Sequence, residues 1–211
     1  MPDVAGAQVA AVVLAAGTSS RMGRNKLLLQ VDREPLVHRT VARAAAAGLD
    51  PLIVVLGHQA DLVQDRLADL PCELVLNPDY EQGVQSSLRA GIGAVPAEAS
   101  AAMVILADMP FVTAQMIAAL ASRYRETAAR LVVSRYGGVN APPTLYDRSL
   151  FAELLAMDGP GCGKHVVRRH RHEALTLDWP DEALADLDVP GDYDRLTALV
   201  GTRQEGHHHA V

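Results

Sequence analysis

The segment that decides the fold is VAAVVLAAGTSSRMGRNK, residues 9–26, near the start of the chain. Its apolar run from Val9 to Leu14 has the length of one strand and is predicted to be a buried β-strand. The small residues and glycines that follow let main-chain N–H groups approach an anion closely. The same loop carries three cations, Arg21, Arg24 and Lys26. We therefore expect a phosphate-binding loop directly after the first strand.

Two common phosphate-binding loops are excluded by their spacing. A Walker A loop has the pattern GxxxxGK[ST], whereas Gly17 and Gly23 do not have that spacing and neither Ser nor Thr follows Lys26. The loop is not a GxGxxG loop either. A polar, glycine-containing loop after a first strand can also serve only to turn the chain, so the sequence of the loop alone leaves a structural role open.

The composition bounds the class of protein. The chain has 211 residues, of which 49% are hydrophobic and 21% charged, so it is long and apolar enough for one α/β domain and is not a disordered chain. Its net charge of −6 argues against general binding to nucleic acid or to an anionic membrane, although a local basic pocket for a small anion is compatible with it. We expect no nucleic-acid or membrane partner.

The N-terminal apolar stretch and the cysteines bear on localisation. No basic residue precedes the apolar residues 9–16, so a buried strand is favoured over a signal peptide, and no apolar run approaches the ~20 residues of a membrane helix. Cys72 and Cys162 form no CxxC pair and indicate two free thiols. We therefore expect a cytoplasmic protein.

Strand-like and helix-like segments alternate along the chain. Strands are predicted at residues 9–14, 52–56, 72–76, 103–107, 131–134 and 175–177, and helices at 35–47, 59–70, 85–95, 113–125, 147–156, 164–169 and 192–200. This order predicts an α/β fold of three layers with a mostly parallel sheet. Because ligands bind at the carboxyl ends of such strands, the loops after Leu14, Leu56, Leu76 and Ala107 should share one edge.

Carboxylates at the ends of predicted strands are candidate metal ligands. Asp108 follows the apolar segment 103–107, where a carboxylate could hold Mg²⁺ together with substrate phosphates. Asp108 could instead cap the next helix, although Thr113 is the better cap. Asp186 and Asp188 lie on one side of an extended segment, and without a partner they could be plain surface residues.

These pieces together resemble the MobA-like nucleotidyltransferase family. Residues 14–26 match every fixed position of its signature LAAGxSxRMGxxK. Four further segments resemble family motifs: the stretch from Asn77-Pro78 to Gly83 and Ser86-Ser87-Leu88, then Asp108-Met109-Pro110, Gly159 to Lys164, and Asp186 to Tyr193. The resemblance covers about residues 9–200. It implies a Rossmann-like nucleotidyltransferase (nucleotide-diphospho-sugar transferase) fold, with residues 1–200 as a single MobA-like domain and residues 201–211 as a mobile tail.

The resemblance is greatest to the MocA-type branch, the molybdenum cofactor cytidylyltransferases. In the family, the LAAG form goes with CTP and LAGG with GTP, and Ala16 stands at that position. A methyl group there would narrow a base pocket and disfavour a purine. The chain departs from the branch at Met109, where Gln is more common, and at Ala141-Pro142-Pro143, where the branch has GHP. The second departure lies in the segment expected near the acceptor.

The resemblance also implies roles for individual residues. Lys26 and Arg21 would neutralise the triphosphate, and Asp108 with Asp188 would hold Mg²⁺ or Mn²⁺, Asp186 being the alternative second ligand. The nucleotide-binding candidates are Leu14, Ala15, Ala16, Gly17, Arg21, Lys26, Asn77, Gly83 and Ser87. The implied reaction transfers CMP from CTP to the phosphate of molybdopterin, with a recipient molybdoenzyme as a further partner.

Two other functions remain open at the level of sequence. A related nucleotidyltransferase could use GTP or another phosphorylated acceptor, such as a sugar phosphate, although the GxGxRxxxxT loop of the sugar-directed branch is absent. A chaperone could bind the cofactor without catalysis. The presence of Lys26 and of the candidate metal-binding carboxylates favours an enzyme over that chaperone.

Overall fold

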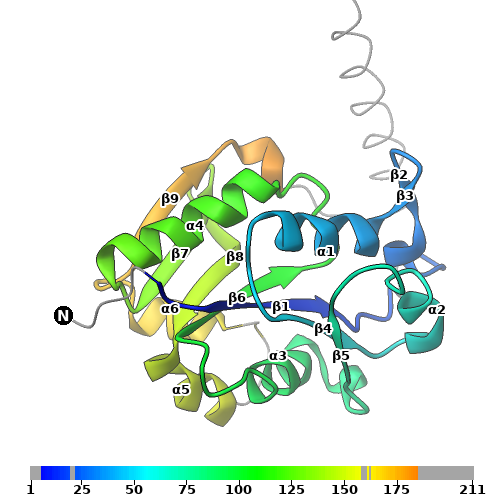
Figure 1. Cartoon of the computed structure of the whole chain (residues 1–211), viewed down its shortest axis with the longest axis horizontal. Helices are drawn as coiled ribbons and strands as arrows, with labels where there is room; N and C mark the ends of the chain where they lie inside the picture. The colour runs from blue at the N-terminus through cyan, green and yellow to red at the C-terminus, as the bar shows by residue number, and fades with distance from the viewer. Residues whose placement is uncertain (1–5, 20–21, 158–160, 162, 185–211) are drawn as a thin grey trace, which may run out of the picture.

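The structure is a computed structural model that describes residues 6–19, 22–157, 161 and 163–184. Within these residues, its centre is a seven-stranded sheet in the order β5-β4-β1-β6-β8-β7-β9 (Figure 1). The strands are β1 (Val9–Ala15), β4 (Leu52–Leu56), β5 (Glu73–Leu76), β6 (Ala101–Leu106), β7 (Leu131–Tyr136), β8 (Val139–Asp147) and β9 (Leu175–Trp179). A small antiparallel pair, β2 (Gln30–Val31) and β3 (Glu34–Pro35), precedes the first helix.

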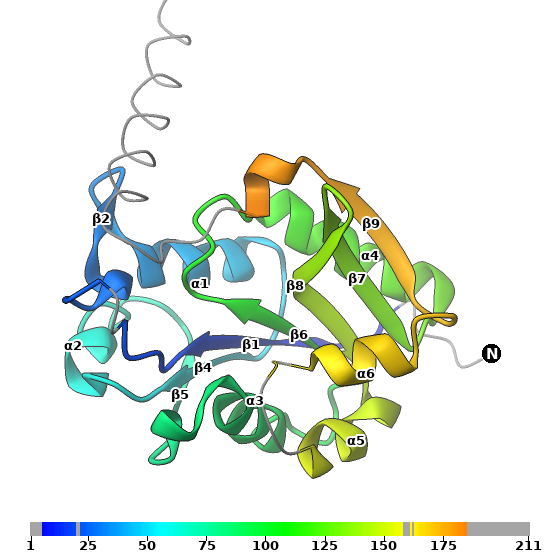
Figure 2. The same ribbon diagram turned by 180° about the vertical axis from the view of Figure 1, so that it is seen from behind.

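Helices cover both faces of the sheet and give three layers. The helices are α1 (Leu36–Ala46), α2 (Ala60–Gln64), α3 (Val84–Gly93), α4 (Ala114–Thr127), α5 (Phe151–Ala156) and α6 (Lys164–Arg169). Figures 1 and 2 show α1 and α4 on one face, and α3, α5 and α6 on the other. Four short 3₁₀ turns complete the described chain: η1 (Lys26–Leu28), η2 (Tyr80–Gln82), η3 (Arg148–Leu150) and η4 (Asp181–Leu184).

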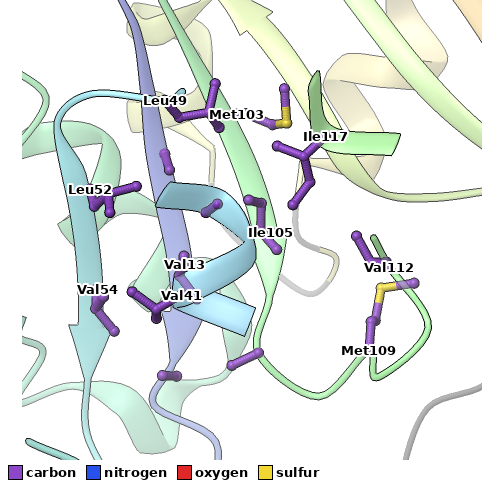
Figure 3. Packing of buried hydrophobic residues seen from close by; sticks show 14 of the residues in the cluster. Val13, Val41, Leu49, Leu52, Val54, Met103, Ile105, Met109, Val112 and Ile117 are labelled. Atoms are coloured by element: carbon purple, nitrogen blue, oxygen red, sulfur yellow. The ribbon is translucent and has the colours of Figure 1, made fainter. Parts of the chain in front are cut away.

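The two-residue period of the central strands divides the core into two clusters. On β1, Val9, Ala11, Val13 and Ala15 pack under α1 and α4, whereas Ala10, Val12 and Leu14 pack against α3 and α5. Figure 3 shows the first cluster, in which Val13 lies between Val41 of α1 and residues of the neighbouring strands. Because β1 is buried on both faces, the loop that follows it starts from a fixed point.

Close approach of α3 to the sheet depends on one glycine. A Cβ atom added at Gly91 would overlap the Cγ1 atom of Val12 and lie 2.9 Å from a methyl group of Val55. The helix can therefore lie directly on β1 and β4, which fixes the position of its first turn relative to the loop after β1.

The sheet differs from a purely parallel one at β8. This strand pairs antiparallel with both β6 and β7, while β1, β4, β5 and β6 run parallel to one another and β7 runs parallel to β9. Prolines interrupt strand ladders, and the sequence pattern at Pro142-Pro143 gave no strand. In the structure these prolines lie where the register with β7 shifts, between the pairs Ser134–Ala141 and Val133–Thr144.

Other element boundaries show where the predictions were right and wrong. Thr113 caps α4 as predicted, its Oγ1 accepting a hydrogen bond from Met116 N at 3.2 Å. The predicted helix over 59–70 is wrong in length, since α2 ends at Gln64. Beyond that point the chain tightens into turns in which Leu67 N donates to Gln64 O, and these turns bring Leu67 into the core. The predicted helix over 192–200 and the tail 201–211 lie outside the described residues.

A histidine on α1 makes the stability of the fold depend on pH. His38 lies between two carboxylates, with Nδ1 2.6 Å from Glu34 and Nε2 3.1 Å from Asp69. Partial burial lowers the pKa of His38, but hydrogen bonds and charge from Asp69 and Glu34 outweigh burial and raise that pKa above 6.5. A raised pKa in the folded state means that the protonated form stabilises the fold. This contribution is complete below the unfolded-state pKa and is lost as pH rises through the folded-state pKa.

We therefore expect a His38→Gln variant to be less stable than the unsubstituted protein at about pH 6, and the difference to shrink towards about pH 8. Urea unfolding at both values measures this difference. A difference for His38→Gln that stays constant with pH would contradict the expectation.

Candidate active site

A cavity of about 390 Å³ opens at the carboxyl edge of the parallel strands, a volume in the range of small-molecule sites. Three loops line it: the loop after β1, the segment after β5 and the segment after β6. Seven of the residues predicted to bind nucleotide or metal line this cavity: Leu14, Ala16, Gly17, Lys26, Gly83, Ser87 and Asp108. The expected meeting of these loops at one edge is confirmed.

The cavity joins a cation and an acid that are distant in sequence. Lys26 Nζ lies 2.6 Å from Asp108 Oδ2, and the two side chains are 12% and 23% exposed. Lys26 opens η1, where the preceding Asn25 caps the turn by accepting a hydrogen bond from Leu27 N at 3.1 Å. Partial exclusion of water strengthens the field of both groups towards a ligand in the cavity.

Ser19 closes the loop that carries Lys26. Its Oγ accepts a hydrogen bond from Lys26 N at 3.1 Å, and its carbonyl accepts one from Met22 N at 2.9 Å. Ser19 itself has a φ of 51°, in the left-handed region that costs a non-glycine residue free energy and that recurs at functional sites. The hydroxyl thus bridges the two ends of the loop and sets the position of Lys26. The family signature contains this serine, but its spacing did not reveal this role.

Ser19→Ala removes the bridge and leaves the charge of the cavity intact. We expect the free energy of unfolding to fall by about 1 kcal/mol. If Lys26 binds the reacting phosphates as predicted, a small displacement of its side chain should lower the kcat of nucleotidyl transfer by roughly tenfold. Steady-state kinetics and urea unfolding measure the two effects. Ser122→Ala, which removes an exposed hydroxyl from α4, is the control, and equal kcat values for the two variants would contradict the assigned role.

Two residues of α1 hold the segment that carries Asp108. Thr40 Oγ1 shares its one proton between the carbonyls of Leu36, at 3.1 Å, and Ala107, at 3.2 Å. Arg43 donates to the carbonyls of Pro110 and Val112, both at 2.6 Å. Burial, followed by the nearby charge of Arg39, lowers the pKa of Arg43 to about 10, so its guanidinium stays protonated at neutral pH. The sequence did not indicate these contacts, since they join α1 to a loop more than sixty positions away.

The first turn of α3 forms another wall. Gly83 precedes the helix with a φ of 103° and a ψ of 177°, a conformation that favours glycine, and Val84 and Ser87 face the cavity. A helix N-terminus presents N–H groups and a partial positive charge towards a ligand. This wall can therefore donate hydrogen bonds to an anionic or carbonyl oxygen.

Asn77 supports this wall from beneath. Only 3% of Asn77 is exposed, and it does not line the cavity. Its Nδ2 donates to Ser86 Oγ at 2.9 Å and to Ser87 Oγ at 3.0 Å, while its Oδ1 accepts a hydrogen bond from Asp79 N. Because Ser87 Oγ accepts from Asn77, its own proton is available as a donor. Asn77 thus orients Ser87.

The side of the cavity between Ala16 and Tyr80 is tightly packed. A Cβ atom added at Gly57 would lie 2.6 Å from Tyr80 Cβ and 2.8 Å from Ala16 Cβ. His58 N donates to the carbonyl of Ala16 at 3.3 Å, which ties the loop after β4 to the loop after β1. The methyl group of Ala16 therefore lies in a rigid wall.

The remaining residues predicted to bind nucleotide or metal do not line the cavity through a described side chain. Arg21, Asp186 and Asp188 are not among the described residues, so their positions relative to Asp108 are left as predictions. Ala15 belongs to β1, but its side chain packs in the opposite cluster under α1. In the described ranges, no three His, Cys, Asp or Glu side chains gather into a metal-binding group, and no helix is long and apolar enough to cross a membrane.

Comparison with known families agrees with this geometry. The sequence profile described as the MobA-like NTP transferase domain matches residues 11–174, which span the cavity, the sheet from β1 to β8 and helix α6. The chain belongs to the MobA-like NTP transferase family. It therefore contains a nucleotidyltransferase domain, and the fold inferred from the resemblance is confirmed.

Individual relatives of this MobA-like transferase are moderately similar. The Bifunctional protein GlmU of Bacillus thuringiensis strain Al Hakam is 32% identical over 125 residues, which are 58% of this chain and 27% of GlmU. The chain thus matches about a quarter of the length of that relative.

Two mycobacterial crystal structures share the fold over most of the chain. The Rv0371c homolog from Mycobacterium sp. strain JC1 has a TM-score of 0.82 and 31% identity, covering 92% of this chain and 97% of its own. Rv0371c from Mycobacterium tuberculosis H37Rv, in complex with manganese, has a TM-score of 0.76 and 28% identity, covering 90% and 98%.

Proposed function

We propose that this nucleotidyltransferase transfers CMP from CTP to the phosphate of a molybdopterin-type cofactor, in a Mg²⁺-dependent reaction that releases pyrophosphate. One observation carries the proposal: Lys26 and Asp108 meet at 2.6 Å in a cavity walled by Ala16 and by the first turn of α3. A triphosphate needs a cation and a metal-binding acid side by side, and the base needs hydrogen-bonding groups within reach of them.

The reaction requires little covalent chemistry from the protein. A phosphate oxygen of the acceptor forms a bond to the α-phosphorus of CTP, and the bond from that phosphorus to the bridging oxygen of pyrophosphate breaks. The attacking oxygen is already ionised at neutral pH, so no side chain has to remove a proton. The protein has to align the two phosphates and neutralise their charge, which are the roles we assign to Lys26 and Arg21.

The donor set at Asp108 fits a hard divalent cation. Its carboxylate is partly exposed in the cavity, and hydroxyl groups of Thr18, Ser19 and Ser87 line the same space. Oxygen ligands of this kind suit Mg²⁺ or Mn²⁺, with water and phosphate oxygens completing the coordination. We assign Asp108 and Asp188 to this ion, Asp186 being the alternative partner. The bound ion would polarise the phosphoryl oxygens.

The wall around Ala16 supports a pyrimidine base. Ala16 lines the cavity, and because its methyl group packs close to Gly57 and Tyr80, it could not move back to admit a larger ring. Ser87, oriented by Asn77, and the N–H groups after Gly83 would donate to acceptor atoms on the edge of cytosine. Ala15, Ala16 and Gly17 would contribute main-chain contacts to base and phosphates.

A screen of CTP, GTP, ATP and UTP with Mg²⁺ and molybdopterin, monitored by pyrophosphate release, tests the proposal. We expect release with CTP and molybdopterin together, and no release when the acceptor is omitted. The Asp108→Asn variant serves as the blank. A clear preference for GTP, or turnover only with a sugar phosphate or another phosphorylated acceptor, would overturn the assignment of substrates while leaving the family intact.

A further inference from the structure

A basic surface lies on and just after α6. It comprises His165, Arg168, Arg169, Arg171 and His172, which we call the α6 patch. The helix is anchored from below: Val166 is fully buried in the core, and Gly163, with a φ of 70°, lies against the ring and hydroxyl of Tyr146. The patch is therefore a fixed arrangement of charges on a packed element.

The local charge contrasts with that of the rest of the chain. The three arginines of the α6 patch and the adjacent Glu153 sum to +2, which leaves −8 for all other residues because the whole chain has −6. Opposite charge on a binding partner would be attracted here and repelled elsewhere on the molecule. The surface thus favours one orientation for an acidic partner.

Some of the basic side chains on and around α6 form ion pairs with carboxylates of the described residues, and others do not. Arg169 donates to Glu153 at 2.5 Å, and His170 bridges Glu153 and Glu173. In the described part of the chain, neither Arg168 nor Arg171 has an ion pair, and Arg168 makes a hydrogen bond with the Nδ1 atom of His165 at 3.0 Å. Guanidinium groups bind carboxylates bidentately and are enriched in protein interfaces. Among the described residues, Arg168 and Arg171 are thus the arginines of the patch whose charge no carboxylate balances.

The residues of the α6 patch line a hollow of about 380 Å³, and a second hollow with apolar lining residues adjoins it. This second hollow, of about 330 Å³, shares His165 and Arg169 with the first and is also lined by Ala156, Met157 and Glu153. An occupant of both hollows would place carboxylates over the arginines and an apolar group against Ala156 and Met157.

The α6 patch is separate from the nucleotide cavity, since the two share no lining residue. Figures 1 and 2 show α6 towards the end of the sheet where β1 begins. The cavity lies at the opposite end of β1, since residues at and after the end of this strand line it. The arginines of the patch therefore do not serve the triphosphate. A nucleic acid is a poorer occupant, because no Phe, Tyr or Trp side chain lines the patch for stacking of bases.

We propose that the α6 patch is a docking surface for an acidic segment of a partner protein. The carboxylates of the segment bind Arg168 and Arg171, and an apolar side chain of the segment packs against Ala156 and Met157. This inference stands independently of the substrates assigned above.

A short fluorescein-labelled peptide of Glu and Asp with one central Leu is the probe, and its Gln and Asn counterpart is the control peptide. Fluorescence anisotropy is measured on the full chain at low and at raised salt. The test variant is Arg168→Glu with Arg171→Glu. The matched control is Arg66→Glu with Arg123→Glu, which makes the same change in net charge at exposed arginines elsewhere.

We expect the acidic peptide to bind and its amide counterpart to bind far more weakly, with affinity falling as salt rises. The test variant should lose roughly tenfold or more in affinity, and the control variant about twofold or less. Pyrophosphate release should be the same in all three proteins, which separates this result from a failure of the catalytic assignment.

Three outcomes would overturn the proposal. Equal losses of peptide affinity in the test and control variants would mean that the peptide responds only to the net charge of the protein and not to this surface. Tighter binding of a single-stranded oligonucleotide than of the acidic peptide, lost in the test variant, would make the surface a nucleic-acid site. Self-association by light scattering that disappears in the test variant would make a second copy of the chain the occupant.

Discussion

Lys26→Ala is expected to slow nucleotidyl transfer by roughly 10²-fold or more, the loss typical of removing one charge-stabilising donor from a phosphoryl site. Its ammonium lies 2.6 Å from Asp108 in the cavity to which we assign the triphosphate and its leaving pyrophosphate. The melting temperature should change little, because η1 is capped by Asn25 and not by the Lys26 side chain. Pyrophosphate release and thermal unfolding measure the two effects.

Two further variants sharpen this test. Lys26→Arg keeps the positive charge but replaces a compact ammonium by a planar guanidinium, so we expect only partial recovery of the rate. Ser19→Ala keeps the lysine and displaces it, so its loss should be smaller than that of Lys26→Ala. Unchanged turnover in Lys26→Ala would refute the role of this residue.

Lys26→Ala should also change how the protein binds metal in the absence of nucleotide. In the structure the ammonium lies against the Asp108 carboxylate, the oxygen ligand we assign to the metal. A cation in that position competes with Mn²⁺ for the same charge. We therefore expect the variant to bind Mn²⁺ more tightly than the unsubstituted protein does when no nucleotide is present. Electron paramagnetic resonance of Mn²⁺ measures this, and weaker binding would place the metal elsewhere.

Asp108→Asn is expected to abolish metal-dependent transfer and to leave the melting temperature nearly unchanged. The amide has almost the shape of the carboxylate but lacks the charge that holds a divalent cation. Thr113, and not Asp108, caps α4, and Thr40 and Arg43 hold the segment through its main chain. The change should therefore leave the fold intact.

Mn²⁺ titration of Asp108→Asn gives a readout that does not depend on turnover, and we expect binding to be lost. Asp79→Asn, a carboxylate on the neighbouring loop that does not line the cavity, is the control. A large loss of stability in Asp108→Asn would indicate a structural role instead, and retained Mn²⁺ binding would remove Asp108 from the metal site.

Structure could be predicted from the sequence where a local pattern of residues determines one strand or one helix end. The apolar run that forms β1 and the helix cap at Thr113 are local patterns, and both were predicted. The segment after β6 could be placed beside the loop after β1 because parallel strands end at one edge. Nearly all of the parallel half of the sheet follows from such patterns.

The misses arise from contacts that are distant in sequence. Pro142 and Pro143 conceal β8, since their effect on the ladder is absorbed by a register shift with β7. The supporting roles of Thr40 and Asn77 depend on which carbonyl or hydroxyl the fold brings next to them. A sequence pattern records residue types and spacing, but it does not record these tertiary partners.

The tether between α1 and the loop after β6 has a mechanical consequence. Helix α1 begins at Leu36, where Leu36 N donates to the carbonyl of Leu29 just after the η1 turn that carries Lys26. Through Thr40 and Arg43, the same helix also contacts the chain on both sides of Asp108. One helix is therefore bonded to the segments that carry Lys26 and Asp108, the two residues to which we assign catalysis. A ligand could change the distance between Lys26 and Asp108 only by also moving α1. The two charges are therefore positioned before the substrate binds, and binding loses little conformational entropy.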